Sequence, residues 1–368
     1  MFATRMQRWA YRHIMKPIFF RCDPESVHDR MILLGKSLGG YSFLRKTAAF
    51  LYAYQSPALE QKILGIRFQN PVGLAAGFDK NAELIDILPS VGFGFGEIGS
   101  ITGESCTGNP KPRLWRLPVS RGLVVNYGLK NDGCEAVASR LKERRFFIPI
   151  GTSIAKTNSP TTVDLEAGLA DYKKAFVSLK DIGDYFTINI SCPNAFGGEP
   201  FSDPDRLDAL LSVLDPIPTS KPIFLKLAVD LSTDIVDALV RVADRHRVNG
   251  FVLANLTKDR QNPMLDQEEL KKVGKGGVSG RPTYDRSNQL IAHLYRTAGK
   301  RYIIIGVGGI FSAQDAYEKI KYGATLVQLI TGMVFEGPQF IGEINRGLVE
   351  LLRTDGFDHI SRAIGILT

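Results

Sequence analysis

From residue 60 onward, short apolar runs alternate along the chain with segments of helical periodicity. The run at 63–68 predicts a pair of short strands, and eight later runs are each long enough for one buried strand, at 71–76, 93–100, 148–154, 184–191, 221–228, 250–256, 302–309 and 324–331. Helical spacing lies between most of them and after the last, as at 165–179, 233–246, 313–322 and 342–352. This alternation predicts an α/β protein with a (β/α)8 TIM barrel. A doubly wound open sheet is the structural alternative, although it usually has fewer strands.

The segment before the barrel, residues 4–54, has helical patterning throughout. Asp23 followed by Pro24 is a typical helix start, and apolar residues then recur at helical spacing until Gly39 and Gly40. Two amphipathic helices in a hairpin are expected. The chain is therefore expected to divide into a small helical subdomain at 1–55 and a barrel at 56–368.

Composition narrows the class of protein. A chain of 368 residues that is 44% hydrophobic and 23% charged can bury a sizeable core, which excludes a wholly disordered protein. Four cysteines, Cys22, Cys106, Cys134 and Cys192, form no C-x-x-C pair and have neither zinc-site nor disulfide-framework spacing. A reducing compartment and no bound metal are expected.

The positive charge is concentrated at the N-terminus. Of the net charge of +8, residues 1–54 contribute +6, from nine Lys or Arg and three acids. Aromatic and aliphatic residues are interleaved with these charges, which favours an interfacial membrane helix over nucleic-acid binding, with a solvated basic face as the simplest alternative. No apolar run reaches the roughly 18 residues of a membrane span, and no secretory signal is recognisable.

Polar or small residues follow the predicted strands and should meet at one end of the barrel, where such folds place their active sites. They are Asp79, Lys80, Ser100, Ser153, Asn189, Cys192, Asn194, Lys226, Asn255, Gly308, Gly309, Thr331 and Gly332. The glycine turns after the seventh and eighth strands suit a phosphate, although G-x-G-G alone could be a tight turn. Lys226, flanked by leucines, needs an anionic partner, whereas Lys80 could be an ordinary surface lysine.

The stretch INISCPN places Cys192 at the edge of an apolar run and not within it. A structural cysteine would more naturally lie inside the run, because a free thiol behaves as a small hydrophobe. Cys192 is therefore a candidate functional residue. The alternative is a bystander thiol beside a functional Ser191.

A series of motifs resembles the dihydroorotate dehydrogenase family, which uses FMN in pyrimidine (UMP) synthesis: NPVGLAAGFDKN, GFGFGEIGS, GNPKPRLWRLP, INISCPN, GGVSGRP, GATLVQL and IIGVGGI. The resemblance runs from about Asp23 to the C-terminus. DPESVHD and the N-terminal helices are similar to those of the membrane-associated class that reduces quinones. The resemblance implies oxidation of (S)-dihydroorotate to orotate, a quinone acceptor, no nucleic acid, and a peripheral location on the cytoplasmic side of the cell membrane.

The resemblance also implies roles for particular residues. FMN contacts are expected at Ala75, Ala76, Gly77, Asp79, Ser100, Ser153, Asn189, Lys226, Ala254, Gly280, Gly308, Gly309, Ile330, Thr331 and Gly332. Substrate contacts are expected at Lys80, Asn126, Tyr127, Gly128, Leu129, Asn189, Asn194 and Asn255, and the quinone site near His28 and Arg116. Cys192 stands where the family keeps its catalytic base, and residues 193–206 would form a lid that excludes water.

Some positions depart from the family pattern. The membrane class normally has serine as the base and the soluble class cysteine, yet a thiol, with an ordinary pKa of about 8.5, ionises more readily than a hydroxyl. Val125 replaces an asparagine, with Asn126 one position later, while Ser153, Ala254 and Ile330 replace asparagine, threonine and tyrosine.

Two other functions are compatible with parts of the sequence. Val125 and Ala254 favour another FMN barrel oxidoreductase that acts on a related substrate or uses a different acceptor. The N-terminal charge alone favours a non-enzymatic protein that binds a membrane surface or nucleic acid.

Overall fold

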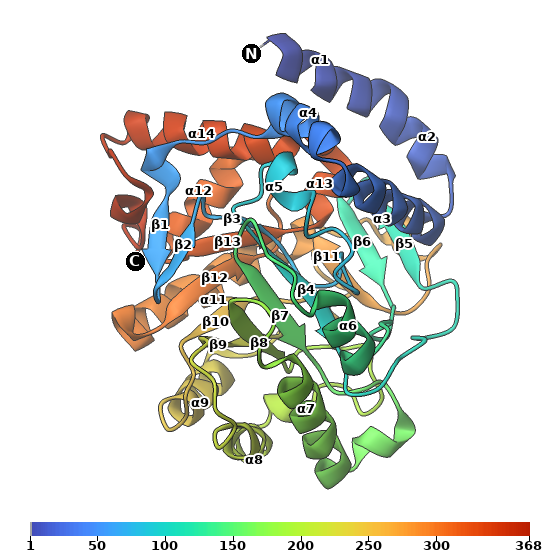
Figure 1. The fold of residues 1–368 in the computed structure, drawn as a ribbon, viewed down its shortest axis with the longest axis vertical. Helices are drawn as coiled ribbons and strands as arrows, with labels where there is room; N and C mark the ends of the chain where they lie inside the picture. Colours follow the sequence, from blue (N-terminus) through green and yellow to red (C-terminus); the bar gives the residue numbers. More distant parts are fainter. Residues whose placement is uncertain (1) are drawn as a thin grey trace.

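A closed barrel of eight parallel strands forms the centre of the computed structural model, which describes residues 2–368 (Figure 1). Met1, the first residue of the expected subdomain, lies outside the described residues. The strands are β3 (Val72–Leu74), β4 (Phe95–Ile101), β7 (Ile150–Ile154), β8 (Tyr185–Asn189), β9 (Ile223–Leu227), β10 (Gly250–Leu253), β12 (Ile303–Val307) and β13 (Leu326–Leu329). The last strand pairs with the first, with Val327 opposite Val72, so the barrel is closed. The predicted (β/α)8 barrel is confirmed, and the open sheet is excluded.

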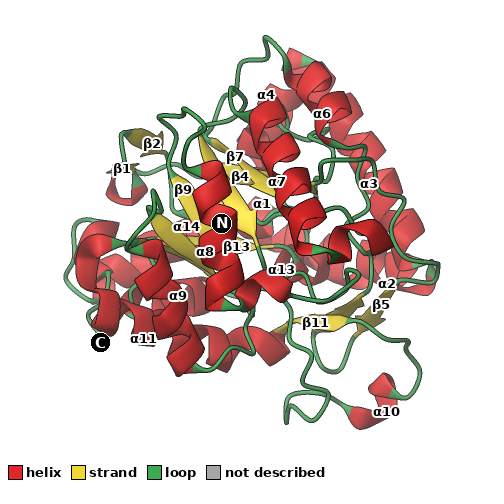
Figure 2. Ribbon diagram, turned by 90° about the horizontal axis from the view of Figure 1, so that it is seen from below, coloured by secondary structure: helices red, strands yellow, loops and turns green. Residues whose placement is uncertain are grey.

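Helices surround the strands (Figure 2). They are α5 (Leu88–Val91), α6 (Cys134–Leu141), α7 (Leu165–Leu179), α8 (Pro204–Leu214), α9 (Thr233–Ala243), α10 (Gln267–Leu270), α11 (Tyr284–Ala298), α12 (Ala313–Lys321), α13 (Thr331–Glu336) and α14 (Phe340–Thr354). Side chains cap the first turns of several helices. Before α7, Asp164 accepts a hydrogen bond from the Ala167 amide, and before α12, Ser312 accepts one from the Asp315 amide. The predicted helix at 165–179 coincides with α7, and the other three differ from α9, α12 and α14 only at their ends.

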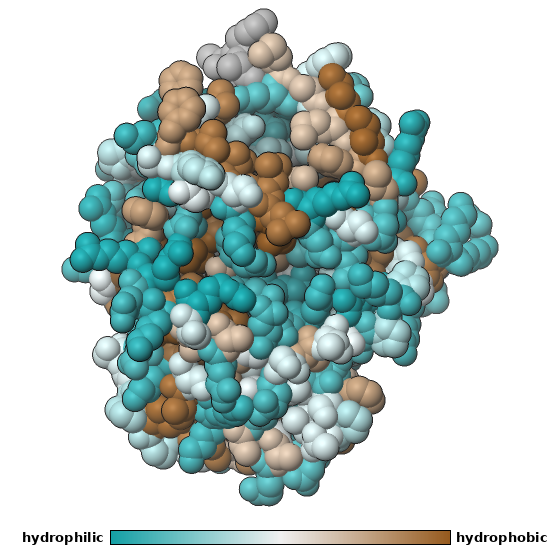
Figure 3. All heavy atoms as spheres, turned by 45° about the vertical axis from the view of Figure 1, so that its right-hand side comes forward, coloured by the Kyte–Doolittle hydropathy of each residue, from teal (hydrophilic) through white to brown (hydrophobic). Residues whose placement is uncertain are grey.

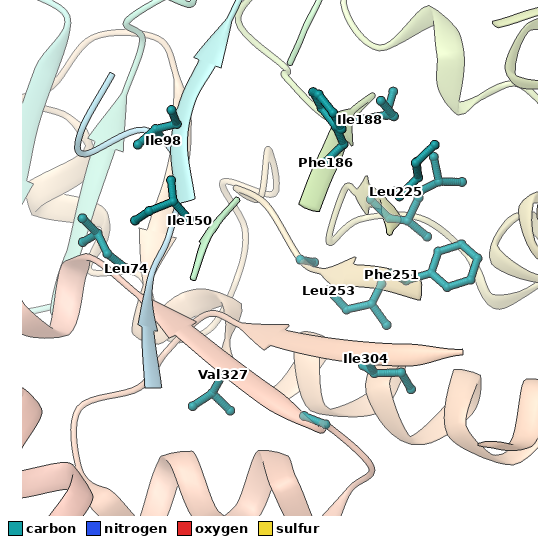
Figure 4. Packing of buried hydrophobic residues seen from close by; sticks show 14 of the residues in the cluster. Leu74, Ile98, Ile150, Phe186, Ile188, Leu225, Phe251, Leu253, Ile304 and Val327 are labelled. Atoms are coloured by element: carbon teal, nitrogen blue, oxygen red, sulfur yellow. The ribbon is translucent and has the colours of Figure 1, made fainter. Parts of the chain in front are cut away.

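Apolar packing closes one end of the barrel. The main core lies between strands and helices, and includes Leu74, Ile98, Ile150 and Leu225 (Figure 4). A second cluster plugs the amino-terminal end of the barrel interior, with Phe68, Phe95, Tyr185, Phe224 and others in contact. Phe68 belongs to the predicted strand pair, seen as the antiparallel hairpin of β1 (Gln61–Ile63) and β2 (Ile66–Phe68). A ligand can therefore enter the barrel only from the opposite, carboxyl end.

A small antiparallel sheet, which the sequence did not predict, lies outside the barrel. It consists of β5 (Leu114–Leu117), β6 (Gly122–Val125) and β11 (Gly277–Gly280), with β6 in the middle. The strands come from the long connections that follow β4 and β10, so residues about 150 positions apart pair, as Val124 does with Val278. Short strands paired over such distances leave no strong local pattern.

The N-terminal segment contains more helix than the predicted hairpin of two. It consists of α1 (Phe2–Ala10), a π-helical turn (Tyr11–Met15), α2 (Lys16–Arg21), α3 (Pro24–Gly40) and α4 (Ser42–Tyr52). Asp23 caps α3 as predicted, by accepting a hydrogen bond from the Ser26 amide at 2.8 Å. The Tyr11 hydroxyl donates to the Val334 carbonyl at 2.7 Å, and Arg8 and Arg12 form ion pairs with Glu343 and Glu336. These contacts attach the helices to α13 and α14.

Large apolar side chains remain exposed on these helices and gather over the top of the molecule (Figure 3). They are Met6, Trp9, Ile14, Met15, Ile18, Leu33, Leu34, Tyr41, Phe43, Phe50 and Leu51. Within residues 2–368, no helix has both the length and the apolar character that crossing a membrane requires.

A buried ion pair connects α3 to the barrel. Both Glu25 and Arg113 are buried, and the Arg113 guanidinium donates to both Glu25 carboxylate oxygens, at 2.8 and 3.1 Å. Burial alone would raise the pKa of Glu25, but the hydrogen bonds and charge of Arg113, with Lys111 and Lys130, hold it at about 2. The same guanidinium donates to the Thr107 and Asn109 carbonyls, so α3 is linked to the loop before β5.

Replacing Glu25 by glutamine should lower the free energy of unfolding at pH 7 by about 3 kcal/mol, because it leaves the Arg113 charge buried without its counter-ion. Since the pKa of Glu25 is depressed in the folded state, the pair stabilises the protein above about pH 4.5 and loses its effect as the pH falls toward 2. Urea unfolding at pH 7 and pH 3 should show the difference between variant and parent shrinking at the lower pH.

Glu60→Gln is the matched control, because its ion pair with Arg67 is exposed to solvent and should contribute little to stability. An equal loss of unfolding free energy in the two variants would show that the buried pair of Glu25 and Arg113 contributes no more than an exposed one.

Candidate active site

A cavity of about 90 Å³ lies at the open, carboxyl end of the barrel. Eleven of the residues predicted to contact a ligand line it: Ala75, Ala76, Lys226, Ala254, Asn255, Gly280, Gly308, Gly309, Ile330, Thr331 and Gly332. Six residues of the set that was expected to converge are among them: Lys226, Asn255, Gly308, Gly309, Thr331 and Gly332. Contact of these residues with a ligand stays a prediction. Ser279 and Thr283, which the sequence analysis did not single out, also line the cavity, and the Ser279 and Thr331 hydroxyls are 2.8 Å apart.

The glycine turn after β12 and the segment 331–332 after β13, which forms the start of α13, have no room for side chains. A Cβ on Gly308 would lie 2.5 Å from the Thr283 hydroxyl oxygen, and one on Gly332 would lie 2.0 Å from the Ile310 carbonyl oxygen. Gly308 and Gly309 also have φ of +112° and +71°, which L-residues rarely adopt. The turns therefore present bare backbone to the cavity, as a phosphate site requires.

Lys226 is the buried cation of this cavity. It lies on β9, and no carboxylate is within ion-pair distance of its ammonium among the described residues. Burial lowers its pKa, and the charge of Glu97 in the barrel interior opposes this effect. One Glu97 oxygen accepts hydrogen bonds from Gln328 and Thr187, at 2.9 and 3.0 Å, so Glu97 is held by the barrel itself.

A hydrogen-bonded chain of amides and hydroxyls joins several strand ends. The Asn189 amide donates to the Ser100 hydroxyl at 2.8 Å, and the Ser100 and Ser153 hydroxyls are 2.7 Å apart. The Ser191 hydroxyl donates to the Asn189 side-chain oxygen at 2.8 Å, and the Asn255 amide donates to the Ser191 carbonyl at 2.7 Å. All five residues were predicted either as ligands or, for Ser191, as the alternative base. Because its hydroxyl is engaged with Asn189, Ser191 is poorly placed to take a proton from a substrate.

Cys192 follows directly and is partly exposed. Burial of its thiol raises the pKa of Cys192 to about 11, a rise to which the charge of Glu199 adds and which the Asn194 backbone, Lys156 and Lys226 reduce. The structure therefore makes this thiol less acidic than the sequence alone suggested. In the loop that follows, the Asn194 amide donates to the Val125 carbonyl at 2.8 Å.

The predicted substrate residues between β6 and α6 do not line this cavity and form a separate wall beside Asn194. Asn109 connects them to the segment at 193–206, which is predicted to form a lid, because its amide donates to the Asn126 side-chain oxygen at 3.1 Å and to the Asn194 carbonyl at 2.9 Å. Gly128 and Leu129 both have positive φ, of +64° and +59°.

The Lys80 ammonium lies 4.1 Å from the centre of the Tyr127 ring. Burial and the charge of Lys130 lower the pKa of Lys80 to about 8.

Asp79 and Gly77 lie outside the lining of the cavity, as do Ser100, Ser153 and Asn189. Both Asp79 carboxylate oxygens accept backbone hydrogen bonds, from Glu83 and Leu84 at 2.8 Å each, and burial raises the pKa of Asp79 to about 6. The Gly77 amide donates to the Gly99 carbonyl at 2.7 Å. These contacts shape the turn after β3, and a direct contact of either residue with a cofactor stays a prediction.

His28 and Arg116, the residues predicted near a quinone, both lie at contacts of the N-terminal helices. His28 contacts the loop after barrel strand β3, and Arg116 lies on β5 of the small sheet. The His28 Nε2 is 3.0 Å from the Phe78 carbonyl, and burial together with the Lys80 charge lowers its pKa to about 4, so the ring is neutral at pH 7. Arg116 donates to the Cys22 carbonyl at 2.8 Å and lies 4.9 Å from the centre of the Phe20 ring.

Sequence reasoning missed three polar residues that hold these walls together: Asn109, Lys156 and Asn158. Asn109 lies in the motif GNPKPRLWRLP, which was recognised without a role for this residue. The other two follow β7, where the Asn158 amide donates to the Asn109 side-chain oxygen at 3.0 Å and to the Gly128 carbonyl at 3.1 Å. Partners so far apart along the chain give no local signal. Among the described residues, no cluster of side chains could hold a metal ion.

The fold and site define a (β/α)8 barrel enzyme whose ligands meet at the carboxyl ends of the strands. The sequence model of the family described as dihydroorotate dehydrogenase matches residues 58–352. The chain is 40% identical to the dihydroorotate dehydrogenase (quinone) of Gloeobacter violaceus over 96% of this chain and 98% of that one. It is 37% identical to the enzyme of that name from Natronomonas pharaonis, again over 96% and 98%.

Solved structures agree with this assignment. The crystal structure of DHODH from Eimeria tenella in complex with ferulenol matches with a TM-score of 0.83 and 27% identity, over 94% of this chain and 95% of that one. The ligand-free form from the same organism matches with a TM-score of 0.81 and 29% identity, over 94% of this chain and 99% of that one. The chain belongs to the dihydroorotate dehydrogenase family, as the motifs predicted.

Proposed function

We propose that this protein oxidises (S)-dihydroorotate to orotate in pyrimidine biosynthesis, with FMN as cofactor and a quinone as electron acceptor. The observation that carries the proposal is the arrangement of Cys192 and the Asn189–Ser191–Asn255 chain beside the glycine turns and Lys226 at one barrel mouth. The names of the full-length relatives support the substrate and the acceptor.

The residues fit FMN. The turns at 308–309 and 331–332 leave no space for a Cβ and would hold the phosphate through backbone amides. Lys226 would supply the positive charge that a reduced flavin ring requires, and its ammonium has no carboxylate partner among the described residues. When bound, FMN would accept the hydride from C6 of dihydroorotate.

The chain's own groups would do the acid–base chemistry. Asn189, Asn194 and Asn255 would orient the ring, with Lys80 as the cation of that wall. The Cys192 thiolate would take the proton from C5, and the C5–H electron pair would form the new double bond as the hydride leaves C6. Residues 193–206 would cover the ring and exclude water.

The N-terminal helices would hold the enzyme at the cytoplasmic side of the cell membrane. The exposed apolar side chains of α1 to α4 together with the basic excess of this segment support a peripheral, anionic-lipid-binding surface. His28 and Arg116, which both lie at contacts of these helices, would line the path of the quinone.

Anaerobic titration of the purified protein tests the proposal. The chromophore released on denaturation should be FMN, dihydroorotate should bleach the bound flavin, and a long-chain quinone should restore its colour faster than fumarate or NAD. Absence of flavin, or of bleaching, would refute the activity. Faster re-oxidation by fumarate or NAD would refute the acceptor alone.

A further inference from the structure

Lys156 is a buried lysine beside the lid that the mechanism above does not use. It follows β7, and its ammonium donates to the Phe196 carbonyl at 2.8 Å and to the Thr162 hydroxyl at 3.4 Å. Among the described residues, no carboxylate lies within ion-pair distance of it. The nearby Asp171 carboxylate already accepts three hydrogen bonds, from the Gly103 and Thr157 amides and the Thr157 hydroxyl.

Lys156 and its neighbour Asn158 hold the lid at a single residue. The Phe196 amide donates to the Asn158 side-chain oxygen at 2.7 Å, while the Phe196 carbonyl accepts from Lys156. Both backbone groups of Phe196 are thus bound by the loop after β7. Phe196 is four positions after Cys192, so these contacts fix the segment that carries the thiol.

Three charged residues act on the Cys192 thiol. Glu199, in the lid, opposes its ionisation, although Glu199 is itself paired with Lys258 at 3.0 Å. Lys156 and Lys226 favour ionisation. Lys226 lines the cavity at the barrel mouth, and its charge also interacts with Glu97 in the barrel interior. An anionic ligand in the cavity would interact with it as well. The charge of Asp171 acts on Lys156 in the same way, but the Asp171 carboxylate is already bound by three other hydrogen-bond donors.

We propose that Lys156 is a positioning residue for the reaction, which holds the Cys192 segment through Phe196 and supplies the positive charge that stabilises the Cys192 thiolate. This role rests on the proposed function, in which Cys192 is the base. This role would link closure of the lid to ionisation of the Cys192 thiol. The closed lid holds the Lys156 ammonium in place, and the thiolate then forms where water is excluded.

The test is the pH dependence of Cys192 alkylation, measured with the full FMN-loaded chain. Cys22→Ser serves as the parent, because Cys22 is exposed whereas Cys106 and Cys134 are buried. Iodoacetamide labelling between pH 7 and 10, quantified on the Cys192 peptide, then reports its thiolate. In Lys156→Gln an amide can still donate to Phe196 but the charge is gone. Labelling at pH 9 should be about tenfold slower than in the parent, the equivalent of one pKa unit.

Two matched variants separate charge from packing. Lys156→Arg keeps the charge and should label within about twofold of the parent at each pH. Asn158→Ala removes the contact to the Phe196 amide but keeps the lysine charge, so its labelling should rise with pH over the same range as in the parent. A profile displaced to higher pH like that of Lys156→Gln would show that packing, and not charge, is responsible, and would overturn the proposal. Labelling of Lys156→Gln that coincides with the parent overturns the proposal, and so does labelling of Lys156→Arg as slow as that of Lys156→Gln. If Lys156→Gln fails to fold, Lys156→Met, which also removes the charge and keeps an unbranched side chain, takes its place in the same comparison.

The labelling of Cys192 is measured without dihydroorotate, so the proposal and the proposed function can fail separately. A normal bleaching rate in Cys192→Ala would refute the base while leaving the labelling result intact. A normal labelling profile in Lys156→Gln would refute only the role of Lys156.

Discussion

Replacing Cys192 by alanine should slow the anaerobic reduction of bound FMN by dihydroorotate by about 10²- to 10⁴-fold, the usual cost of losing a general base. The thiol lies on the loop that leaves β8, beside the chain of amides expected to hold the ring. Alanine removes only the sulfur, so FMN content should not change. Stopped-flow absorbance of the flavin measures the rate directly.

Ser191→Ala is the control for this prediction. Its hydroxyl donates to Asn189 and accepts from Asn255 at 3.1 Å, so the substitution should loosen the ring site and raise KM without a comparable loss of the reduction rate. If Ser191→Ala instead loses the chemical step and Cys192→Ala is near normal, the base is Ser191.

The same reaction should accelerate with pH. Because burial raises the pKa of Cys192 to about 11, the thiol is mostly protonated at neutral pH, and each unit of pH increases the thiolate about tenfold. The reduction rate should therefore rise through pH 7 to 9 without a plateau. A Cys192→Ser variant should retain some activity and shift the profile to higher pH, since a hydroxyl gives up its proton less readily than a thiol.

Substituting Gly332 by alanine should weaken FMN binding by at least about 10²-fold. The new Cβ would lie 2.0 Å from the Ile310 carbonyl oxygen, a backbone atom that cannot rotate away. The turn after β13 would have to separate from the turn after β12, and the two could not hold one phosphate together. Flavin fluorescence during dilution of the holoenzyme gives the dissociation constant.

Gly342→Ala is a closely matched control. Its Cβ would lie 1.9 Å from the Tyr52 carbonyl oxygen, a clash of the same kind at the contact of α14 with the N-terminal helices. It should lower the melting temperature but leave the FMN dissociation constant unchanged. Equal loss of FMN in both variants would show that general destabilisation, and not the phosphate turn, is responsible.

The barrel could be predicted because its strands are buried on both faces. Runs such as 302–309 are continuously apolar and are bounded by turns, so each strand carries its own signal. The glycine turns were predictable for the same reason, since their position follows from the strand before them. Helix α4 lies in the segment whose helical patterning was recognised, but its separation from α3 at Tyr41 was not predicted. The sheet of β5, β6 and β11 was missed, because it forms only through tertiary contacts such as the pairing of Val124 with Val278.

Residues of the site at the ends of strands could be predicted. Residues whose partners lie on a distant loop could not. Asn189, Lys226 and Asn255 were found from their strands. Lys156 and Asn158 acquire their significance only from Phe196, about 40 positions later, which no periodicity connects to them. The charge environment that makes the Cys192 thiol less acidic was likewise invisible until Glu199 and the burial of the thiol were seen. The boundary between the subdomain at 1–55 and the barrel stays a prediction.

The apolar plug that closes the amino-terminal end of the barrel has a consequence for engineering. Phe68, Phe95, Tyr185 and Phe224 are packed at the end away from the lid, so stability and ligand choice reside at opposite ends of the same strands. A library that randomises loops at the mouth leaves this packing untouched. Redesign of the substrate range should therefore be tolerated there, whereas stabilising substitutions can be sought at the plug without cost to specificity.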